Sequence, residues 1–284
     1  MHWARETACV LFFTLTPLTS PTSPTSLTSL TPPTPPTPPT TPTAAQAPDP
    51  ARLADSLSRV MDSAFIAGER PRIEAAKRLL DRAAALYPKD GLLLHYQGYA
   101  IYRLVELPPL PVGKERDALL GEGIEGLKAS EALLPLAETH ALRWLLLAQT
   151  ISDAGSAMAV LGDMQQEQAD AERLGKDNPR VWLIEGVGTF FTPAGFGGGP
   201  EPALAKLQKA AELFGNDHPA KARPAWGRAE VQAWLGIVHQ KLGHTAESRK
   251  AYQEALRIEP GFNWVKYQLL PGLDKGVQPF PGVP

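Results

Sequence analysis

Apolar residues recur at helical spacing through almost the whole chain after residue 48. In residues 50–67, for example, Leu53, Leu57, Val60, Met61 and Ala64 follow one another every one to four positions, as on one face of a helix. Sustained alternation of apolar and polar residues, the mark of a half-buried strand, is missing from the sequence. The pattern therefore predicts an all-α protein.

Proline and glycine divide this pattern into helices that come in pairs. The second pair and the third pair are longer than the others, and prolines between residues 108 and 111 interrupt the second. Terminal repeats of a helical array need a cap, and a short apolar helix near the C-terminus supplies one. We expect about five pairs plus this cap, with helices at residues 50–67, 72–87, 91–107, 115–134, 139–153, 160–175, 180–191, 200–214, two between 225 and 260, and 262–270.

Residues 232–260 give the clearest unit. Gly236 on the first helix and Ser248 on the second are small, so we expect these helices to pack closely there, with leucine at position 236 far more costly than alanine. Gly243 ends the first helix and Pro260 ends the second. Three glycines in the helix expected at 115–134, Gly121, Gly123 and Gly126, indicate a second close helix contact.

These residues resemble the tetratricopeptide repeat (TPR), a helix–turn–helix unit of about 34 residues. The resemblance rests on Leu235-Gly236, on the Ser248–Tyr252 step, and on Ala255 and Pro260, although Gln232 replaces the usual Trp and His239 the usual Tyr. A single unit cannot bury its apolar face, so the resemblance implies an α-α superhelix with further pairs upstream.

The two ends of the chain differ from this body. We divide the chain into a signal-like leader (1–20), a disordered Thr/Pro-rich linker (21–48), a TPR-like domain (49–270) and an irregular tail (271–284). The apolar run at residues 8–15 is too short to span a membrane but fits a secretory leader. We therefore expect an exported protein, either periplasmic or secreted. If the leader stays uncleaved, it would anchor the protein. The alternative is a disordered leader on a cytosolic protein.

Composition and motifs argue against nucleic-acid binding, metal binding and the common catalytic sites. Net charge is −2 at pH 7, which argues against nucleic acid as a partner. The single cysteine, Cys9, permits no internal disulfide and no cysteine metal site. The sequence contains no HExxH and no GxSxG, and His239 and His244, five apart, do not share a helix face. We expect no enzyme, no cofactor and no metal, with a hydrolase of unrecognised site as a remote alternative.

The glycine-rich loop at residues 194–199 precedes a helix, a position where backbone N–H groups can hold phosphate. It lacks the Lys and Ser/Thr of a P-loop and follows no strand, so we favour a turn. The loop resembles one found in exported bacterial repeat proteins, which implies an exported TPR protein of that type.

In the TPR family the first helix of each pair lines a concave groove, and the resemblance places a largely apolar and aromatic set of residues there. The Lys and Asn clamp of chaperone-binding TPR proteins is missing. Two interpretations stay open: core residues, buried by tight curvature or by the tail around Trp264, or a hydrophobic ligand groove. The residues are His95, Tyr99, Tyr102, Arg103, Leu145, Gln149, Leu183, Val187, Phe190, Phe191, Trp234, Ile237 and Lys241.

The groove and the leader together favour an exported scaffold that binds a protein or peptide. A periplasmic carrier of a small molecule or lipid, using the same groove, is the alternative. Partner identity and oligomeric state are left open by the sequence.

Overall fold

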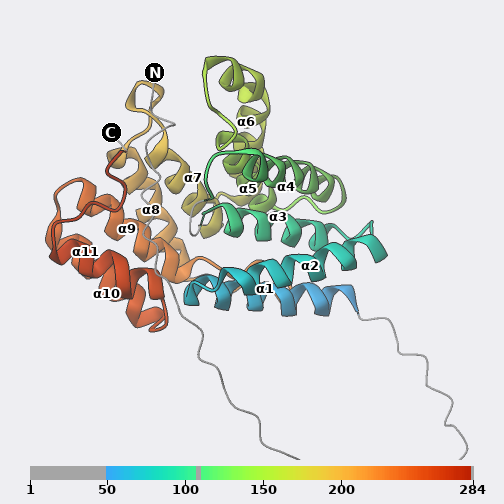
Figure 1. Cartoon of the computed structure of the whole chain (residues 1–284), viewed down its shortest axis with the longest axis horizontal. Helices are drawn as coiled ribbons and strands as arrows, with labels where there is room; N and C mark the ends of the chain where they lie inside the picture. Colours follow the sequence, from blue (N-terminus) through green and yellow to red (C-terminus); the bar gives the residue numbers. More distant parts are fainter. Residues whose placement is uncertain (1–48, 107–109, 283–284) are drawn as a thin grey trace, which may run out of the picture.

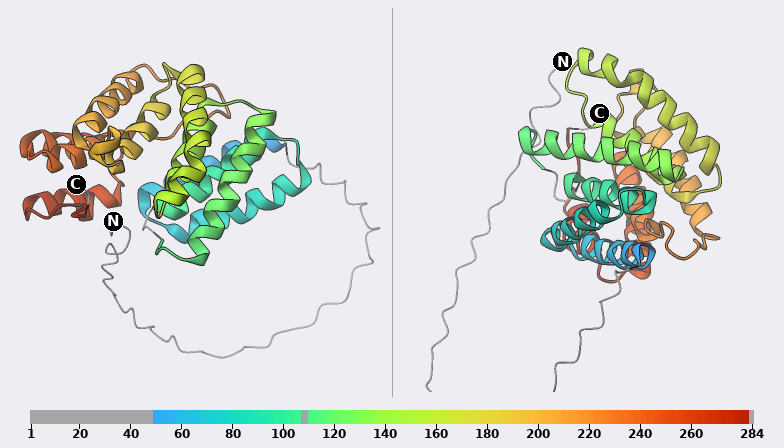
Figure 2. Two further views of the ribbon diagram at one scale, coloured as in Figure 1. Left: turned by 90° about the horizontal axis from the view of Figure 1, so that it is seen from above. Right: turned by 90° about the vertical axis from the view of Figure 1, so that its right-hand side faces the viewer.

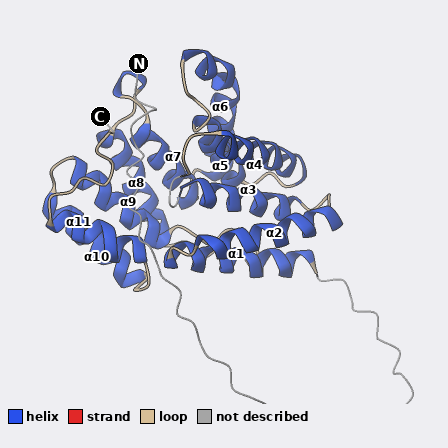
Figure 3. Cartoon of the chain, in the orientation of Figure 1, coloured by secondary structure: helices blue, strands red, loops and turns tan. Residues whose placement is uncertain are grey.

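The computed structural model describes residues 49–106 and 110–282, and both the leader and the linker, expected at residues 1–20 and 21–48, lie outside this range. Helices and loops make up the described chain, in which no strand occurs (Figure 3). None of its helices is both long enough and apolar enough to cross a bilayer.

Ten helices of the described residues form five consecutive pairs, as expected (Figure 1). They are α1 (Pro50–Ala67) with α2 (Arg70–Leu86), α3 (Gly91–Glu106) with α4 (Lys114–Leu133), α5 (Ala137–Ala148) with α6 (Ala154–Gly175), α7 (Pro179–Phe191) with α8 (Pro200–Phe214), and α9 (Arg228–Lys241) with α10 (Thr245–Ile258).

Local chemistry places the helix ends. Asp49 accepts a hydrogen bond from the amide of Ala51 at 3.1 Å at the start of α1, and Gly68 ends that helix in the left-handed region at φ 68°. Asp153 and Ser156 form a capping box at the start of α6. Helix α5 is shorter than predicted because the chain turns at residues 149–150, and α6 begins earlier than predicted, at the Asp153 cap.

Each helix packs against its partner, and the first helices α1, α3, α5, α7 and α9 also contact one another in that order. The pairs therefore follow one another around a curved axis, as Figure 2 shows. This stacking buries one continuous core, which none of the pairs could form alone.

Small residues permit the closest helix contacts. Ser248 Oγ donates a hydrogen bond to the carbonyl oxygen of Gly236 at 2.8 Å, and the ring of Tyr252 lies directly against Gly236. Among the three glycines of α4, only Gly123 faces a neighbouring helix; Gly121 and Gly126 have open space beside them. The predicted contact through α4 is thus correct for Gly123 alone.

A last helix closes the array and is longer than predicted. It contains a π-helical turn, Val265–Leu269, and continues as α11 (Leu270–Asp274), so residues 271–274 of the expected irregular tail are helical. The wider π turn relieves the clash between the ring of Pro271 and the carbonyl group one turn earlier. Irregular chain begins only after residue 274.

This closing segment returns to the start of the array. Asn263 Nδ2 donates a hydrogen bond to the carbonyl oxygen of Ala67 at 2.8 Å, and the rings of Phe65 and Phe262 lie 5.7 Å apart. The end of α1 and the segment after α10 are therefore in direct contact, although almost 200 residues separate them.

Candidate functional site

Most residues expected to line a groove are interior side chains. Gln149, Phe191 and Lys241 are partly exposed. The others are buried, which favours the core interpretation over one open groove along the first helices; they are His95, Tyr99, Tyr102, Arg103, Leu145, Leu183, Val187, Phe190, Trp234 and Ile237. Two segments cover part of this set, the loop before α9 and the C-terminal tail.

Trp226, in the loop before α9, covers the N-terminal part of the expected groove. Its ring stacks on Tyr99 with centroids 5.2 Å apart and planes inclined by 22°. Beneath it, the guanidinium of Arg103 lies 3.8 Å from the ring centroid of Phe65. Arg103 donates to both carboxylate oxygens of Glu230 on α9, at 2.8 and 2.7 Å. This part of the groove is thus filled by a paired charge and stacked rings.

Tyrosine hydroxyls complete the network around this ion pair. Tyr102 donates to Glu230 at 3.2 Å, and Tyr99 donates to Asp62 on α1 at 2.5 Å. Burial raises the pKa of Asp62 to about 6, although the hydrogen bond from Tyr99 and the charge of Arg103 oppose the shift. Sequence reasoning missed Asp62 and Glu230; an arginine on an apolar helix face was the signal that a buried acid had to exist.

The C-terminal tail covers the other part of the expected groove in a looser way. Phe280 stacks on Trp234 with centroids 5.7 Å apart and planes inclined by 5°, and meets Phe191 edge-on at 5.2 Å. Gln240 Nε2 donates to the carbonyl oxygen of Val277 at 2.7 Å. Residues 274–278 are exposed, whereas Phe280 is half-buried. One aromatic side chain and a few backbone contacts therefore hold the tail in place.

A hollow of about 450 Å³ opens beside Phe190, lined in part by Thr192, Lys241 and the glycine-rich loop. The amide of Gly199 donates to the carbonyl oxygen of Thr189 at 2.9 Å, and the amide of Gly197 donates to that of Ala194 at 3.0 Å. Because the loop uses these N–H groups internally, they do not present a cradle for phosphate. This supports the interpretation of the loop as a turn.

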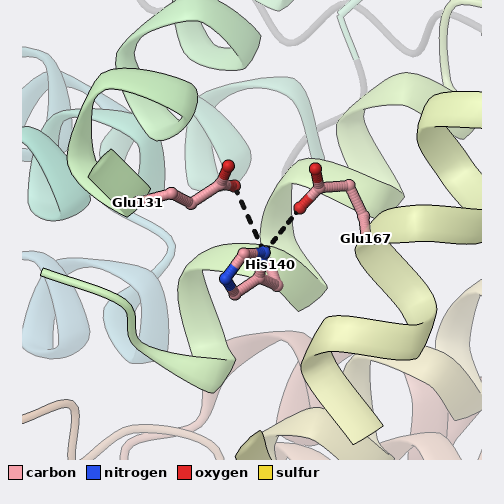
Figure 4. A group of neighbouring side chains, drawn as sticks. All are labelled: Glu131, His140 and Glu167. Atoms are coloured by element: carbon pink, nitrogen blue, oxygen red, sulfur yellow. Dashed lines mark hydrogen bonds and ion pairs between the residues drawn. The ribbon is translucent and has the colours of Figure 1, made fainter. Parts of the chain in front are cut away.

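A separate charged cluster joins α4, α5 and α6. Figure 4 shows Glu131 and Glu167 on either side of His140. His140 Nδ1 lies 2.7 Å from Glu167 and 3.7 Å from Glu131. Arg143 contacts Glu167 directly and reaches Glu131 at 3.4 Å. The sequence did not single out this group, because its members lie on three helices.

Charge balance explains this cluster. Burial and the neighbouring Glu167 raise the pKa of Glu131 to about 7. Burial lowers the pKa of His140, but its hydrogen bond to Glu167 and the two carboxylate charges outweigh this and raise it overall. A divalent cation between these carboxylates would have to displace Arg143. The arrangement fits an ion-pair network that ties three helices together better than it fits a metal site.

Comparison with known proteins shows which repeat family part of this chain matches. The model of the tetratricopeptide repeat family matches residues 229–262, which span α9 and α10. Residues 229–262 therefore form a tetratricopeptide repeat. No curated protein matches the chain.

Several solved structures are similar to this chain, among them the following two. A thermophilic TPR protein from Thermus thermophilus superposes with a TM-score of 0.55 at 19% identity, covering 79% of this chain and 97% of that one. The HusA haemophore from Porphyromonas gingivalis gives a TM-score of 0.56 at 19% identity, covering 69% of this chain and 96% of that one. At this identity the likeness concerns the fold alone, an all-α superhelix of helix pairs.

Proposed function

We propose that this TPR protein is an exported, non-enzymatic scaffold that binds an extended protein segment anchored by one aromatic residue. The observation that carries the proposal is Phe280. A short stretch of the protein's own tail lies across α7 and α9, with its aromatic ring on Trp234 and Phe191 and a backbone carbonyl bonded to Gln240. These are the contacts by which an extended peptide partner is held.

The tail defines what the partner would look like. Residues 276–282 read Gly-Val-Gln-Pro-Phe-Pro-Gly, so the bound ring is flanked by prolines that favour an extended chain. A partner segment with an aromatic residue between prolines would offer the same anchor. The near-neutral charge of the scaffold favours such a segment over nucleic acid.

A partner segment has to compete with the protein's own tail for this surface. A tethered tail acts at an effective concentration on the order of millimolar, so a free segment must displace it. Phe280→Ala removes the anchoring ring and leaves Trp234 and Phe191 in place. We therefore expect the full-length Phe280→Ala variant to bind a labelled Gly-Val-Gln-Pro-Phe-Pro-Gly peptide in fluorescence polarisation at least about tenfold more tightly than the unchanged protein.

Two controls make this test specific. Val277→Ala alters an exposed tail side chain and should leave peptide binding unchanged. A peptide with Ala in place of Phe should fail to bind. If Phe280→Ala binds neither peptide, or both equally, the proposal that this surface receives an aromatic segment is wrong.

A second measurement tests the carrier interpretation, in which the same surface binds a small molecule or lipid. Native mass spectrometry of the Phe280→Ala variant would show a co-purified small molecule if the surface serves as a carrier site. Export is tested separately, by locating the protein in a fractionated bacterial host and determining the N-terminus of the exported form.

A further inference from the structure

The turn between α9 and α10 brings two histidines together. His239 belongs to the last turn of α9 and His244 immediately precedes α10. Spacing along a single helix predicted that they would not share a face. In the structure their Nδ1 atoms lie 3.4 Å apart and their ring centroids 5.6 Å apart. The turn between the two helices, and not the periodicity of one helix, brings the two rings close together.

Backbone hydrogen bonds fix this turn. Gly243 adopts a left-handed conformation at φ 78°, its amide donates to the carbonyl oxygen of Gln240 at 3.1 Å, and the amide of His244 donates to the carbonyl oxygen of His239 at 2.8 Å. This pair of bonds is a Schellman motif, in which side chains at the two outer positions contact each other and are usually apolar. Here both outer positions carry imidazole rings.

The role of His244 at the start of α10 is also unusual. This position is the N-cap, where Ser, Thr, Asp or Asn normally accepts a hydrogen bond from the first turn. His244 makes no such side-chain bond. His239 is half-buried, and His244 beside it is exposed to solvent. The two histidines therefore lie at the protein surface.

The distance between the two Nδ1 atoms indicates which metal coordination geometry they fit. This distance exceeds the usual length of a hydrogen bond from an N–H group to its acceptor, about 2.7–3.2 Å. Two imidazole nitrogens bound to one tetrahedral Zn²⁺ at about 2.0–2.1 Å would lie about 3.3–3.4 Å apart. Two neighbouring ligands in a square-planar site would be closer, about 2.8–3.0 Å. The observed 3.4 Å fits the tetrahedral arrangement.

We propose that His239 and His244 form a two-histidine surface site for Zn²⁺, with water at the remaining coordination positions. Neutral imidazole is the form that binds metal. The carboxylate of Glu247 belongs to the same surface hollow as His239. Lys250 and Arg257 line the same surface hollow, so the two nitrogens and not the local charge must supply the affinity.

The test is a titration of the full-length protein, freed of metal with a chelator, with ZnCl₂ by isothermal calorimetry. We expect one Zn²⁺ per chain, and at least about a tenfold loss of affinity in both His239→Gln and His244→Gln. Zn²⁺ should also raise the Tm of the unchanged protein but not of either variant, because binding to the native state alone stabilises it.

Two control variants separate this site from other histidines. His218→Gln changes an exposed histidine in the loop before α9, and His140→Gln removes the histidine of the α4–α6 cluster. Both should bind Zn²⁺ like the unchanged protein. Loss of the calorimetric signal in His140→Gln, or equal binding by His239→Gln and the unchanged protein, would overturn the proposal. So would the lack of any binding by the unchanged protein.

Discussion

Single glycines determine how closely two helices approach, and Gly236 is the sharpest case. An added Cβ at this position would overlap the ring of Tyr252, which is itself fully buried. The sequence predicted that alanine would cost far less than leucine there, and the structure indicates that alanine too carries a cost. Gly236→Ala should lower the free energy of unfolding by roughly 1–3 kcal/mol through overpacking. Urea denaturation followed by circular dichroism measures this.

Gly126 provides the matched control at the same scale. It lies within α4, and nothing lies within 4 Å of an added Cβ. Gly126→Ala should therefore raise the free energy of unfolding by up to about 1 kcal/mol, since alanine loses less backbone freedom in a helix. Equal effects of the two substitutions would mean that Tyr252 does not pack on Gly236.

His95 gives a prediction for pH. It is fully buried, with Nδ1 2.8 Å from Thr139 Oγ1, and burial, followed by the charge of Arg223, lowers its pKa to about 3. Between about pH 6.5 and pH 3 the unfolded chain binds a proton here that the native chain does not, so stability falls as pH drops. His95→Asn should reduce the slope of stability against pH below pH 6.5 by up to about 1.4 kcal/mol per pH unit.

The comparison that checks this prediction is the slope and not the absolute stability, because His95→Asn also changes packing. His218→Asn, at an exposed position, should keep the slope of the unchanged protein. Parallel curves for His95→Asn and the unchanged protein would show that His95 does not resist protonation in the native state.

At the scale of elements, the sequence predicted most helices to within a few residues because Pro and Gly mark their ends. It predicted the groove less well. Whether Tyr99 is open or covered depends on Trp226, which is far away in the sequence, and the position of Phe280 on Trp234 depends on a tail with no periodicity of its own. Contacts of this kind depend on the whole fold, and local spacing carries no signal for them.

Helix α6 is packed against the rest of the protein mainly along its second half. Its buried residues, Glu167, Ala171 and Gly175, all lie in its second half. In the first half Met158 is 72% exposed and Leu161 is 44% exposed. Few packed contacts imply low local stability. Hydrogen exchange followed by mass spectrometry should therefore show residues 154–163 exchanging at least about tenfold faster than residues 167–175. Equal protection would indicate that another molecule covers this half.

At the scale of the whole molecule, the Arg103–Glu230 pair joins α3 to α9, and both side chains are almost completely buried. Glu230→Gln leaves a buried guanidinium without its counter-charge and should lower the free energy of unfolding by about 3–5 kcal/mol. The double variant Arg103→Met, Glu230→Leu should lose less than Glu230→Gln alone, because it leaves no unpaired charge. Thermal unfolding followed by calorimetry tests this order, and an additive loss in the double variant would contradict it.

The contact between the two ends of the array has a consequence for how this protein can evolve. Open helical arrays gain or lose whole repeats by duplication, since each repeat touches only its neighbours. Here Asn263 bonds to Ala67, and Glu230 bonds to Arg103. An extra helix pair inserted between α4 and α9 would carry Glu230 away from Arg103 and leave a buried charge alone. Selection should therefore hold the number of pairs at five, and variation in length should be confined to loops and to the chain ends.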